Sequence, residues 1–501
     1  MMFFWWALPA LLVLLAIASG RANTTQAALL GLLAALPVAW LTGPSTVGAA
    51  VLGEALWRGV WIGAVIAPYI LGGLLFWQVA ARAPQAVAPP AGPGSDDPLA
   101  RRRLAFFACF LVGPFAESAT GFGVGMLGTV VLLRPLGLAP RHLMVFALLS
   151  QSLIPWGAMS SGTLLAAAYA RLPPALLGLY TLLPAALLMA IWLCLFWATA
   201  RAAGLPGTAG QRLEEAGWVA AGLGLLGLST HFLGPETALL AAYGPLIVLR
   251  YLRDQRPDWR QARAAAARAV PYAVLIGSLA VSRLVPGVRE ALDSLGRVAP
   301  FADLPAWAPL YHAGSWLVAG ALLTALLRRQ TAWLGQECRH AWRTGQHAVL
   351  AVFLFAMMAE VLTVSGISGA FAQSTLQAFG EKAILLAPPL SGLFGVLTNS
   401  GNPANSLFLP SHVTLALEAG LSVPLVAALQ HASGTSLGLF SPVRMSIAAG
   451  LAGGRGQERQ VYRGLLPYAA SALLVLLVFA LFVISLGAAP AVAPAMTSRG
   501  V

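Results

Sequence analysis

The stretch Gly113-Pro-Phe-Ala-Glu-Ser-Ala-Thr-Gly-Phe-Gly123 is a small, polar, glycine-rich interruption inside an otherwise apolar part of the chain. A counterpart, Thr398-Asn-Ser-Gly-Asn-Pro-Ala-Asn-Ser406, interrupts an apolar run in the C-terminal half. Backbone groups at membrane depth must find their hydrogen bonds within the protein or in a wet cavity, so such interruptions are costly unless they line something. Two interruptions at corresponding places in the two halves of a membrane chain indicate a transporter's binding site.

A further interruption follows each of these stretches along the chain. The first copy continues to Ser150-Gln-Ser-Leu-Ile-Pro-Trp-Gly157 and Ser160-Ser-Gly-Thr163, and the second to Gln430-His-Ala-Ser-Gly-Thr-Ser436 and Ser441-Pro-Val-Arg444. We expect each half to contain a re-entrant hairpin followed by a broken transmembrane helix. The alternative is that these small residues only let membrane helices pack closely.

The composition indicates an all-α polytopic membrane protein. Of the 501 residues, 58% are hydrophobic and 9% are charged, against roughly 25% charged residues in a soluble domain. The arginines that give the net charge of +13 occur singly or in short loop clusters, which is typical of topology signals and not of a nucleic-acid interface. The cysteines and histidines have no ligand spacing, so we expect no metal and no cofactor.

Basic loops predict the topology, because positively charged loops stay in the cytoplasm. We interpret the loops near residues 82–103, 134–142, 250–268, 328–343 and 455–463 as cytoplasmic. The parity of the spans between them then places the first hairpin on the cytoplasmic face and the second, with its loop at 411–419, on the outer face. The chain is thus predicted to contain two inverted repeats, with about 12 spans plus two hairpins.

These assignments divide the chain into five parts. They are N-terminal spans and a cytoplasmic loop at 1–103, the first hairpin and broken helix at 104–200, central spans with basic loops at 201–346, the second hairpin and broken helix at 347–487, and a disordered tail at 488–501. In the first part, Glu54 and Arg58 lie four residues apart and predict a helical ion pair at the membrane interface.

The hairpin tips and helix breaks suit a small organic anion. Backbone N–H groups at the ends of broken helices carry partial positive charge that favours a carboxylate, and hydroxyl and amide side chains add donors. The predicted substrate-binding residues are Ser118, Thr120, Gly121, Gly123, Ser152, Trp156, Thr398, Asn399, Ser400, Asn402, Asn405, Ser433, Ser441 and Arg444. Arg444 is either a partner for the substrate carboxylate or an arginine that extends to the membrane surface.

Proton coupling needs an ionisable group at membrane depth, and such groups are functional hypotheses by default. Glu117 in the first hairpin and Glu360 before the second are the acidic candidates, and His431 is a third candidate. The alternatives are that Glu117 only caps backbone amides of its hairpin and that His431 is a packing residue.

At these residues the chain resembles the lactate permease family of bacterial secondary transporters. Glu117-Ser-Ala-Thr-Gly-Phe-Gly123 is similar to that family's E-[SG]-A-[AT]-G-F-G signature, and Leu397-Thr-Asn-Ser-Gly-Asn-Pro-Ala-Asn-Ser-Leu-Phe408 is similar to its L-T-G-S-[DN]-T-x-S-N-x-L-F stretch. Shorter similarities are Ser365-Gly-Ile-Ser368, Gln430, Ser441-Pro442 and Gly450-Leu-Ala-Gly453. Gly401 stands where the family often has an aspartate, so the chain is a divergent member in which Glu360 is a candidate replacement acid.

The resemblance implies a proton-coupled permease for lactate and related 2-hydroxymonocarboxylates in the bacterial cytoplasmic (inner) membrane, surrounded by lipid. A sodium-coupled transporter of another organic anion, an ion channel and a membrane subunit of a pump are the alternatives. We expect no enzyme, because no nucleophile–base set is visible, and no ATP-driven transport by this chain alone, because no nucleotide-binding loop is present. The sequence leaves open whether the chain forms a homo-oligomer.

Overall fold

The computed structural model describes residues 2–82, 97–121 and 123–487, and within these ranges the regular elements are helices. The exception is an isolated antiparallel bridge between Val298 and Trp307. The tail at 488–501 and residues 83–96 of the predicted cytoplasmic loop lie outside the described residues. An all-helical chain agrees with the expected fold class.

Seven of the described helices are long and apolar enough to cross a membrane. They are α2 (Thr24–Thr42), α3 (Ala49–Ala81), α9 (Pro174–Ala202), α10 (Ala209–Leu233), α12 (Trp259–Leu284), α15 (Leu334–Val364) with the short η4 (Thr331–Trp333), and α21 (Glu458–Ser485). α1 (Met2–Ala18) and α14 (Ala313–Leu327) are shorter apolar helices. The chain is therefore a multi-pass membrane protein, and the number of about 12 spans stays a prediction.

Local sequence signals begin many of these helices. Capping boxes start α2 at Asn23, α10 at Thr208 and α12 at Asp258. In each box the first side chain accepts a hydrogen bond from the backbone N–H three residues later, and the glutamine side chain at that later position accepts one from the backbone N–H of the first residue. Proline, which lacks the N–H that a first turn leaves unpaired, occupies the first turn of α9 and of α11 (Pro235–Gln255). The remaining helices outside the repeats are α13 (Pro286–Ser294) and α16 (Ile367–Phe379).

The first glycine-rich stretch forms the turn of a helical hairpin. Its first arm runs without interruption through α4 (Pro98–Phe107), the π-helical η1 (Ala108–Val112) and α5 (Gly113–Thr120), and its second arm is α6 (Val124–Leu133). Gly121 and Gly123 have φ values of 73° and 81°, which only glycine adopts freely. These two residues allow the chain to reverse direction at the tip.

The next helix is broken, as expected. η2 (Arg134–Leu136) leads to α7 (Pro140–Leu149), and α7 is separated from α8 (Ser161–Ala170) by a non-helical segment and the short η3 (Ala158–Ser160). Gly157, Met159 and Ser160 all have positive φ. Met159 and Ser160 rarely adopt this conformation, so surrounding packing must hold the break in place.

The second half repeats the pattern. η5 (Gly380–Leu386) leads to a hairpin of α17 (Ala387–Thr398) and α18 (Gly401–Glu418), and the broken helix consists of α19 (Val423–Leu437), η6 (Gly438–Phe440) and α20 (Pro442–Ala452). The expected loop at 411–419 is wrong in its bounds, because α18 continues to Glu418 and the connection is 419–422.

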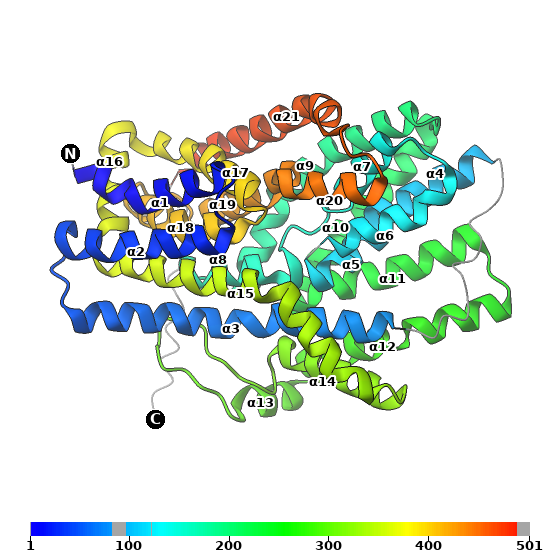
Figure 1. Cartoon of the computed structure of the whole chain (residues 1–501), viewed down its shortest axis with the longest axis horizontal. Coiled ribbons are helices and arrows are strands. Elements are labelled where there is room, and N and C mark those ends of the chain that lie inside the picture. The colour runs from blue at the N-terminus through cyan, green and yellow to red at the C-terminus, as the bar shows by residue number, and fades with distance from the viewer. Residues whose placement is uncertain (1, 83–96, 122, 488–501) are drawn as a thin grey trace.

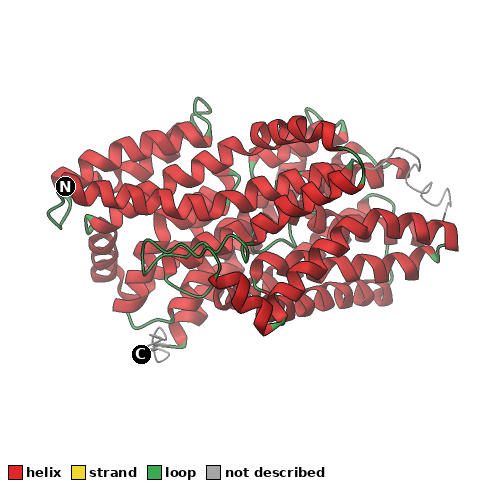
Figure 2. Cartoon of the chain, turned by 90° about the horizontal axis from the view of Figure 1, so that it is seen from below, coloured by secondary structure: helices red, strands yellow, loops and turns green. Residues whose placement is uncertain are grey.

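The two hairpins lie at different ends of the molecule. Figure 1 shows α4, α5, α6 and α7 toward one end of the long axis and α16 and α18 toward the other, with α8, α17 and α19 nearer the middle. The view from below shows most helices running along this same axis (Figure 2). The inverted repeat stays a prediction.

Close packing joins α3 to α15, which lie side by side in Figure 1. A Cβ atom added to Gly59 would lie 2.4 Å from the Cα of Met357, and one added to Gly63 would lie 2.6 Å from the ring of Phe353. Glycine at these positions lets two membrane helices approach closely. The pair forms one side of the cavity described below.

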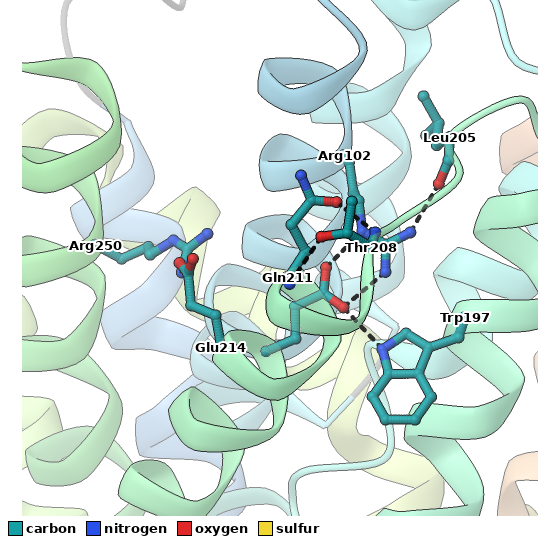
Figure 3. A network of polar contacts seen from close by, with 8 residues as sticks. Arg102, Trp197, Leu205, Thr208, Gln211, Glu214 and Arg250 are labelled. Atoms are coloured by element: carbon teal, nitrogen blue, oxygen red, sulfur yellow. Dashed lines mark hydrogen bonds and ion pairs between the residues drawn. The ribbon is translucent and has the colours of Figure 1, made fainter.

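A buried ion pair anchors the base of the first hairpin (Figure 3). Arg102 on α4 is 1% exposed and donates two hydrogen bonds to Glu215 on α10, of 2.8 and 2.7 Å, and a third of 2.7 Å to the carbonyl of Leu205. Trp197 on α9 also donates to Glu215, at 2.8 Å. Bidentate geometry and additional partners are what a buried pair needs to offset its desolvation.

Candidate functional site

A cavity of about 430 Å³ lies where the two hairpin tips and the two broken helices meet. The polar side chains that line it come from both halves of the chain. They are Asn23, Thr24, Glu117, Thr120, Gln151, Ser161, His347, Thr398, Asn399, Ser400, Asn402, Ser406, Thr435 and Arg444. Apolar residues of α3 and α15, including Ile70, Val352 and Phe355, form another part of the lining. The fold thus brings together segments that extend from Asn23 to Ile447 in the sequence.

At the first tip, Glu117 closes the hairpin. Its carboxylate oxygens accept hydrogen bonds from the backbone N–H groups of Gly123 (3.1 Å) and Gly125 (2.9 Å). These groups lie at the start of α6, where backbone N–H groups have no partner within the helix. Glu117 is 2% exposed and also lines the cavity. Its carboxylate therefore caps backbone amides and at the same time borders the space that a substrate would occupy.

At the second tip, Arg444 joins the broken helix to the hairpin. Its Nε donates a hydrogen bond of 2.8 Å to Oδ1 of Asn399, the tip residue that has a φ of 61°. Ser400 accepts a hydrogen bond from the N–H of Asn402 and caps α18. In the part of the chain that the structure describes, neither Arg444 nor Glu117 is in an ion pair. The cavity thus presents one carboxylate and one guanidinium whose charges are not paired with other side chains.

Eight of the predicted substrate-binding residues line the cavity. They are Thr120, Gly121, Gly123, Thr398, Asn399, Ser400, Asn402 and Arg444. Four others are not among its lining residues: the hydroxyls of Ser118, Ser152 and Ser433 each donate to a backbone carbonyl of the preceding turn, and Ser441 caps α20. Trp156 is fully buried, and its indole N–H has no hydrogen-bond partner among the described residues.

Asn405 and His431 lie in a polar layer behind the cavity surface, and both are fully buried. His431 contacts Nδ2 of Asn405 through Nδ1 (3.0 Å) and Oγ1 of Thr163 through Nε2 (3.0 Å). Because an amide NH₂ can only donate, Nδ1 of His431 accepts, and Nε2 carries the proton of the neutral ring and donates it to Thr163. His431 therefore links α19 and α18 of the second half to the broken helix of the first.

Sequence reasoning missed several residues that line the cavity. Gln151, Ser161, Ser406 and Thr435 all lie within or beside the interruptions that the sequence singled out. The sequence placed these residues in the interruptions. It could not show which of their side chains face the cavity, because composition does not reveal how a non-helical turn is oriented. His347 and Asn23 come from helices that the sequence pattern did not connect to the site.

Glu360 does not line the cavity. It accepts a hydrogen bond of 2.8 Å from Nε of Arg58, and the same guanidinium binds both carboxylate oxygens of Asp303 at 3.1 and 2.5 Å. The expected helical pair between Glu54 and Arg58 is therefore wrong, because the partners of Arg58 come from distant segments. The hydrogen bond from Arg58 lowers the pKa of Asp303 below its usual range.

A comparison with protein families matches residues 296–487 to the family model described as L-lactate permease. The matched part, which is less than half of the chain, is similar to the L-lactate permease family. The match confirms the resemblance seen in the sequence, and it includes the second hairpin and second broken helix, with Asn399 and Arg444. No curated protein matches the chain. L-lactate permeases are transporters and not enzymes, and the long apolar helices agree with a membrane transporter.

The structure offers a physical reason for Gly401, where this chain departs from the motif of the family that it resembles. A Cβ atom added at Gly401 would lie 2.9 Å from Oγ1 and 3.2 Å from N of Thr435. α17 also packs closely on α19, since a Cβ atom added at Gly395 would lie 2.1 Å from the carbonyl oxygen of Gly434. A side chain at position 401 therefore requires the Thr435 side chain to move and the backbone of α19 to shift slightly. Within the described residues, no group of three or more His, Cys, Asp or Glu side chains is arranged to hold a metal ion.

Proposed function

We propose that this chain is a secondary active transporter that carries lactate or a related 2-hydroxymonocarboxylate together with a proton across the bacterial cytoplasmic membrane. The observation that carries the proposal is the shared cavity, into which the tips of both hairpins and the breaks of both interrupted helices converge. Such breaks are tolerated at membrane depth where they line a cavity. The similarity of residues 296–487 to the L-lactate permease family supports the substrate class.

The substrate carboxylate is assigned to the Arg444 side of the cavity. Nε of Arg444 donates its hydrogen bond to Asn399. The two terminal nitrogens of Arg444 make no hydrogen bond within the described chain. Together they can donate two parallel hydrogen bonds to a carboxylate. Thr120, Ser400 and Asn402 add hydroxyl and amide groups that suit the 2-hydroxyl group and the second carboxylate oxygen. The guanidinium also neutralises the charge of the bound anion.

The coupling proton is assigned to Glu117. A buried carboxyl next to a bound anion gains from protonation, because two negative charges in one low-dielectric site repel each other. Glu117 borders the cavity and has no cationic side-chain partner, whereas Glu360 is neutralised by Arg58. Its capping of Gly123 and Gly125 further suggests that protonation changes the shape of the tip. His431, one layer behind the cavity, is the second candidate.

Alternating access would follow from the inverted arrangement of the repeats. Each hairpin packs beside a broken helix, and the two pairs approach the cavity from different ends (Figure 1). A rocking or sliding movement of these pairs against α3 and α15 would then expose the cavity to one side at a time. A continuous pore would not need paired hairpins, so a channel is the less favoured interpretation.

Uptake by purified protein in liposomes tests the proposal. We expect saturable accumulation of labelled L-lactate that is driven by an imposed pH gradient, and no stimulation by a sodium gradient at constant pH. Acetate, glycolate and malate serve as competitors. Acetate lacks the 2-hydroxyl group that glycolate has, and malate carries a second carboxylate, so the three compounds test the need for each group separately. Accumulation driven by sodium alone would replace the proton with sodium, and non-saturable flux would favour a channel.

A further inference from the structure

Four charged side chains form a cluster away from the cavity residues, and we refer to Arg58, Arg171, Asp303 and Glu360 as the charge cluster. Arg58 binds Glu360 at 2.8 Å and Asp303 at 2.5 Å, and Arg171 lies 3.0 Å from Asp303 and 4.0 Å from Glu360. The members come from α3, α15, the end of α8 and the loop between α13 and α14. The cluster therefore ties a broken helix to two helices of the cavity lining.

The order of residues along α15 places this cluster at the end of the cavity opposite its opening. His347 lines the cavity and is exposed, as is Asn23, so the cavity is open beside these residues; Gly121 and Val443 at the hairpin tip and helix break are further exposed lining residues. Phe355 also lines the cavity but is 1% exposed, and Glu360 follows it by about 8 Å at 1.5 Å per residue. The adjacent α3 runs antiparallel to α15, because Gly59 touches Met357 and Gly345 touches Leu74.

The broken helix leads from the cavity to the same cluster. Ser161 and Gly162 at the start of α8 line the cavity, and Arg171 follows the last residue of that helix, about 15 Å further on at 1.5 Å per residue. α3, α8 and α15 therefore each carry a residue that lines the cavity and lead to a member of the charge cluster. The cluster lies beyond the cavity lining at that end.

Asp303 occupies a position that a free carboxylate would also fit. Arg58 holds it with two parallel hydrogen bonds, which is the bidentate geometry that guanidinium groups form with carboxylates, and Arg171 supplies a second cation. The Asp303 side chain is half exposed, at 49%, and belongs to a loop and not to a helix. Glu360, by contrast, is 6% exposed and fixed on α15.

Two buried hydroxyl groups lie near this cluster and beside the cavity. Tyr169 precedes Arg171 by two residues, and its hydroxyl lies within hydrogen-bonding reach of Ser406 of the second hairpin, which lines the cavity. Both side chains are at least nine-tenths buried. Neither hydroxyl has a partner of good geometry among the described residues, so each is able to donate to a passing carboxylate.

We propose that Arg58 and Arg171 form a second carboxylate site for the transported monocarboxylate at the closed end of the cavity, and that the Asp303 carboxylate occupies this site when that end is shut. The inference rests on the proposed function for the identity of the substrate. An arriving monocarboxylate replaces Asp303 on the two guanidinium groups, the loop moves away, and Tyr169 and Ser406 provide the next contacts toward the cavity.

Cysteine labelling tests this site without requiring transport. In a Cys194→Ser, Cys338→Ser background, Asp303→Cys removes the occupying carboxylate and leaves a thiol beside both arginines. Anionic and cationic methanethiosulfonate reagents of similar size are then compared. We expect the anionic reagent to react faster by about tenfold, as electrostatic attraction to a focused positive site allows. L-lactate should slow this reaction, whereas lactamide and an equal concentration of chloride should not.

Matched variants separate the site from a general surface charge. Adding Arg171→Gln to the cysteine variant should remove both the preference for the anionic reagent and the protection by lactate. Arg297→Gln, which breaks an exposed pair with Asp293 in the same region, should change neither. A preference that persists after Arg171→Gln, or protection by chloride equal to that by lactate, would overturn the proposal.

A transport measurement shows on which face of the membrane the second site acts, and it distinguishes failure of this proposal from failure of the proposed function. In the otherwise natural chain, Arg171→Gln should raise the KM for uptake several-fold when lactate is added on the face from which residue 303 is labelled, and leave the KM from the opposite face unchanged. Normal lactate uptake with unprotected labelling and an unchanged KM would refute the second site and leave the proposed function standing. Protected labelling in a protein that moves no lactate would refute the proposed function instead.

Discussion

Nε of Arg444 on α20 donates a hydrogen bond of 2.8 Å to Oδ1 of Asn399 at the tip of the second hairpin. The contact joins two segments that must act together if the hairpin and the broken helix bind one anion. The hydrogen bond also orients the planar guanidinium group, because it holds the Nε edge and leaves the two terminal nitrogens free to bind another group. The position of Arg444 along the chain gave no sign of this partner.

Replacing this arginine should weaken substrate binding strongly. We expect Arg444→Gln to raise the Kd for L-lactate about 10- to 100-fold, since hydrogen bonds to charged groups contribute about 1.5–3 kcal/mol. Asn399→Gly keeps the positive φ and removes only the partner, so it should have a smaller effect. Isothermal titration in detergent measures both. Arg455→Gln, an exposed arginine just beyond α20, is the control, and equal losses in it would contradict the assignment.

Two polar residues at different depths should give different phenotypes. Thr120 lines the cavity, so Thr120→Val should lower the affinity for substrate and leave the Tm nearly unchanged. Asn405 donates to the buried His431, so Asn405→Leu should lower the free energy of unfolding by about 1–3 kcal/mol, the cost of a buried group without its partner. Thermal denaturation and binding on the same samples distinguish them. A Tm loss in Thr120→Val alone would reverse the assignments.

Glu117→Gln tests coupling at the first hairpin. The amide resembles a protonated carboxyl, so uptake driven by a pH gradient should fail while exchange of internal for external substrate continues. A Gln side chain has only one acceptor oxygen, so one of the bonds to Gly123 and Gly125 is lost, and the Tm should fall as well. Glu360→Gln, which affects the charge cluster, is the comparison. Accumulation against the gradient by Glu117→Gln would move the coupling to His431 or to another ion.

The opposite orientation of the hairpins can be measured directly. A cysteine at Ala139, between η2 and α7, should react with a membrane-impermeant reagent only from the cytoplasm, and a cysteine at Ala419, after α18, only from outside. Both changes are small and lie in connections between helices. Intact cells and inverted vesicles provide the two exposures. Labelling of both positions from one face would exclude inverted repeats.

The charge cluster should not contribute to pH dependence near neutrality. The hydrogen bond from Arg58 lowers the pKa of Asp303 in the folded protein, so its stabilising effect is fully present above the unfolded value of about 4. The effect is lost only as the pH falls through the lower folded value. We therefore expect Asp303→Asn to leave the shape of the uptake profile between pH 5 and 8 unchanged. A shifted midpoint would show that Asp303 titrates in this range.

The sequence predicted the hairpin tips and helix breaks because their signals are local. Glycine frees the backbone at its own position, as at Gly121 and Gly123, and proline restricts it, as at Pro442. The predicted interruptions coincide with the end of α5 and the starts of α6 and α20. The role of Glu360 could not be predicted in this way. Its partner Arg58 lies 302 residues away, and only the antiparallel packing of α3 on α15 brings the two together.

Within the site, residue type was a better guide than residue position. Ser118, Ser152 and Ser433 have the right chemistry, but each hydroxyl bonds to its own helix. Serine in a membrane helix often makes this bond, and sequence alone does not distinguish it from a serine that faces a ligand. Gln151 and Thr435 have the same composition signal and do face the cavity.

The break between α7 and α8 also has a consequence for the synthesis of the protein. Each half is ten residues long, about 15 Å, which is half the thickness of the hydrocarbon core. Neither half can be inserted as an independent span, so the segment must wait at the insertion machinery until later helices cover its free backbone groups. Glu360 of α15, which helps to hold the end of α8 through the charge cluster, is translated about 190 residues after Arg171. The first half of the protein therefore matures only after the chain has been made at least as far as α15.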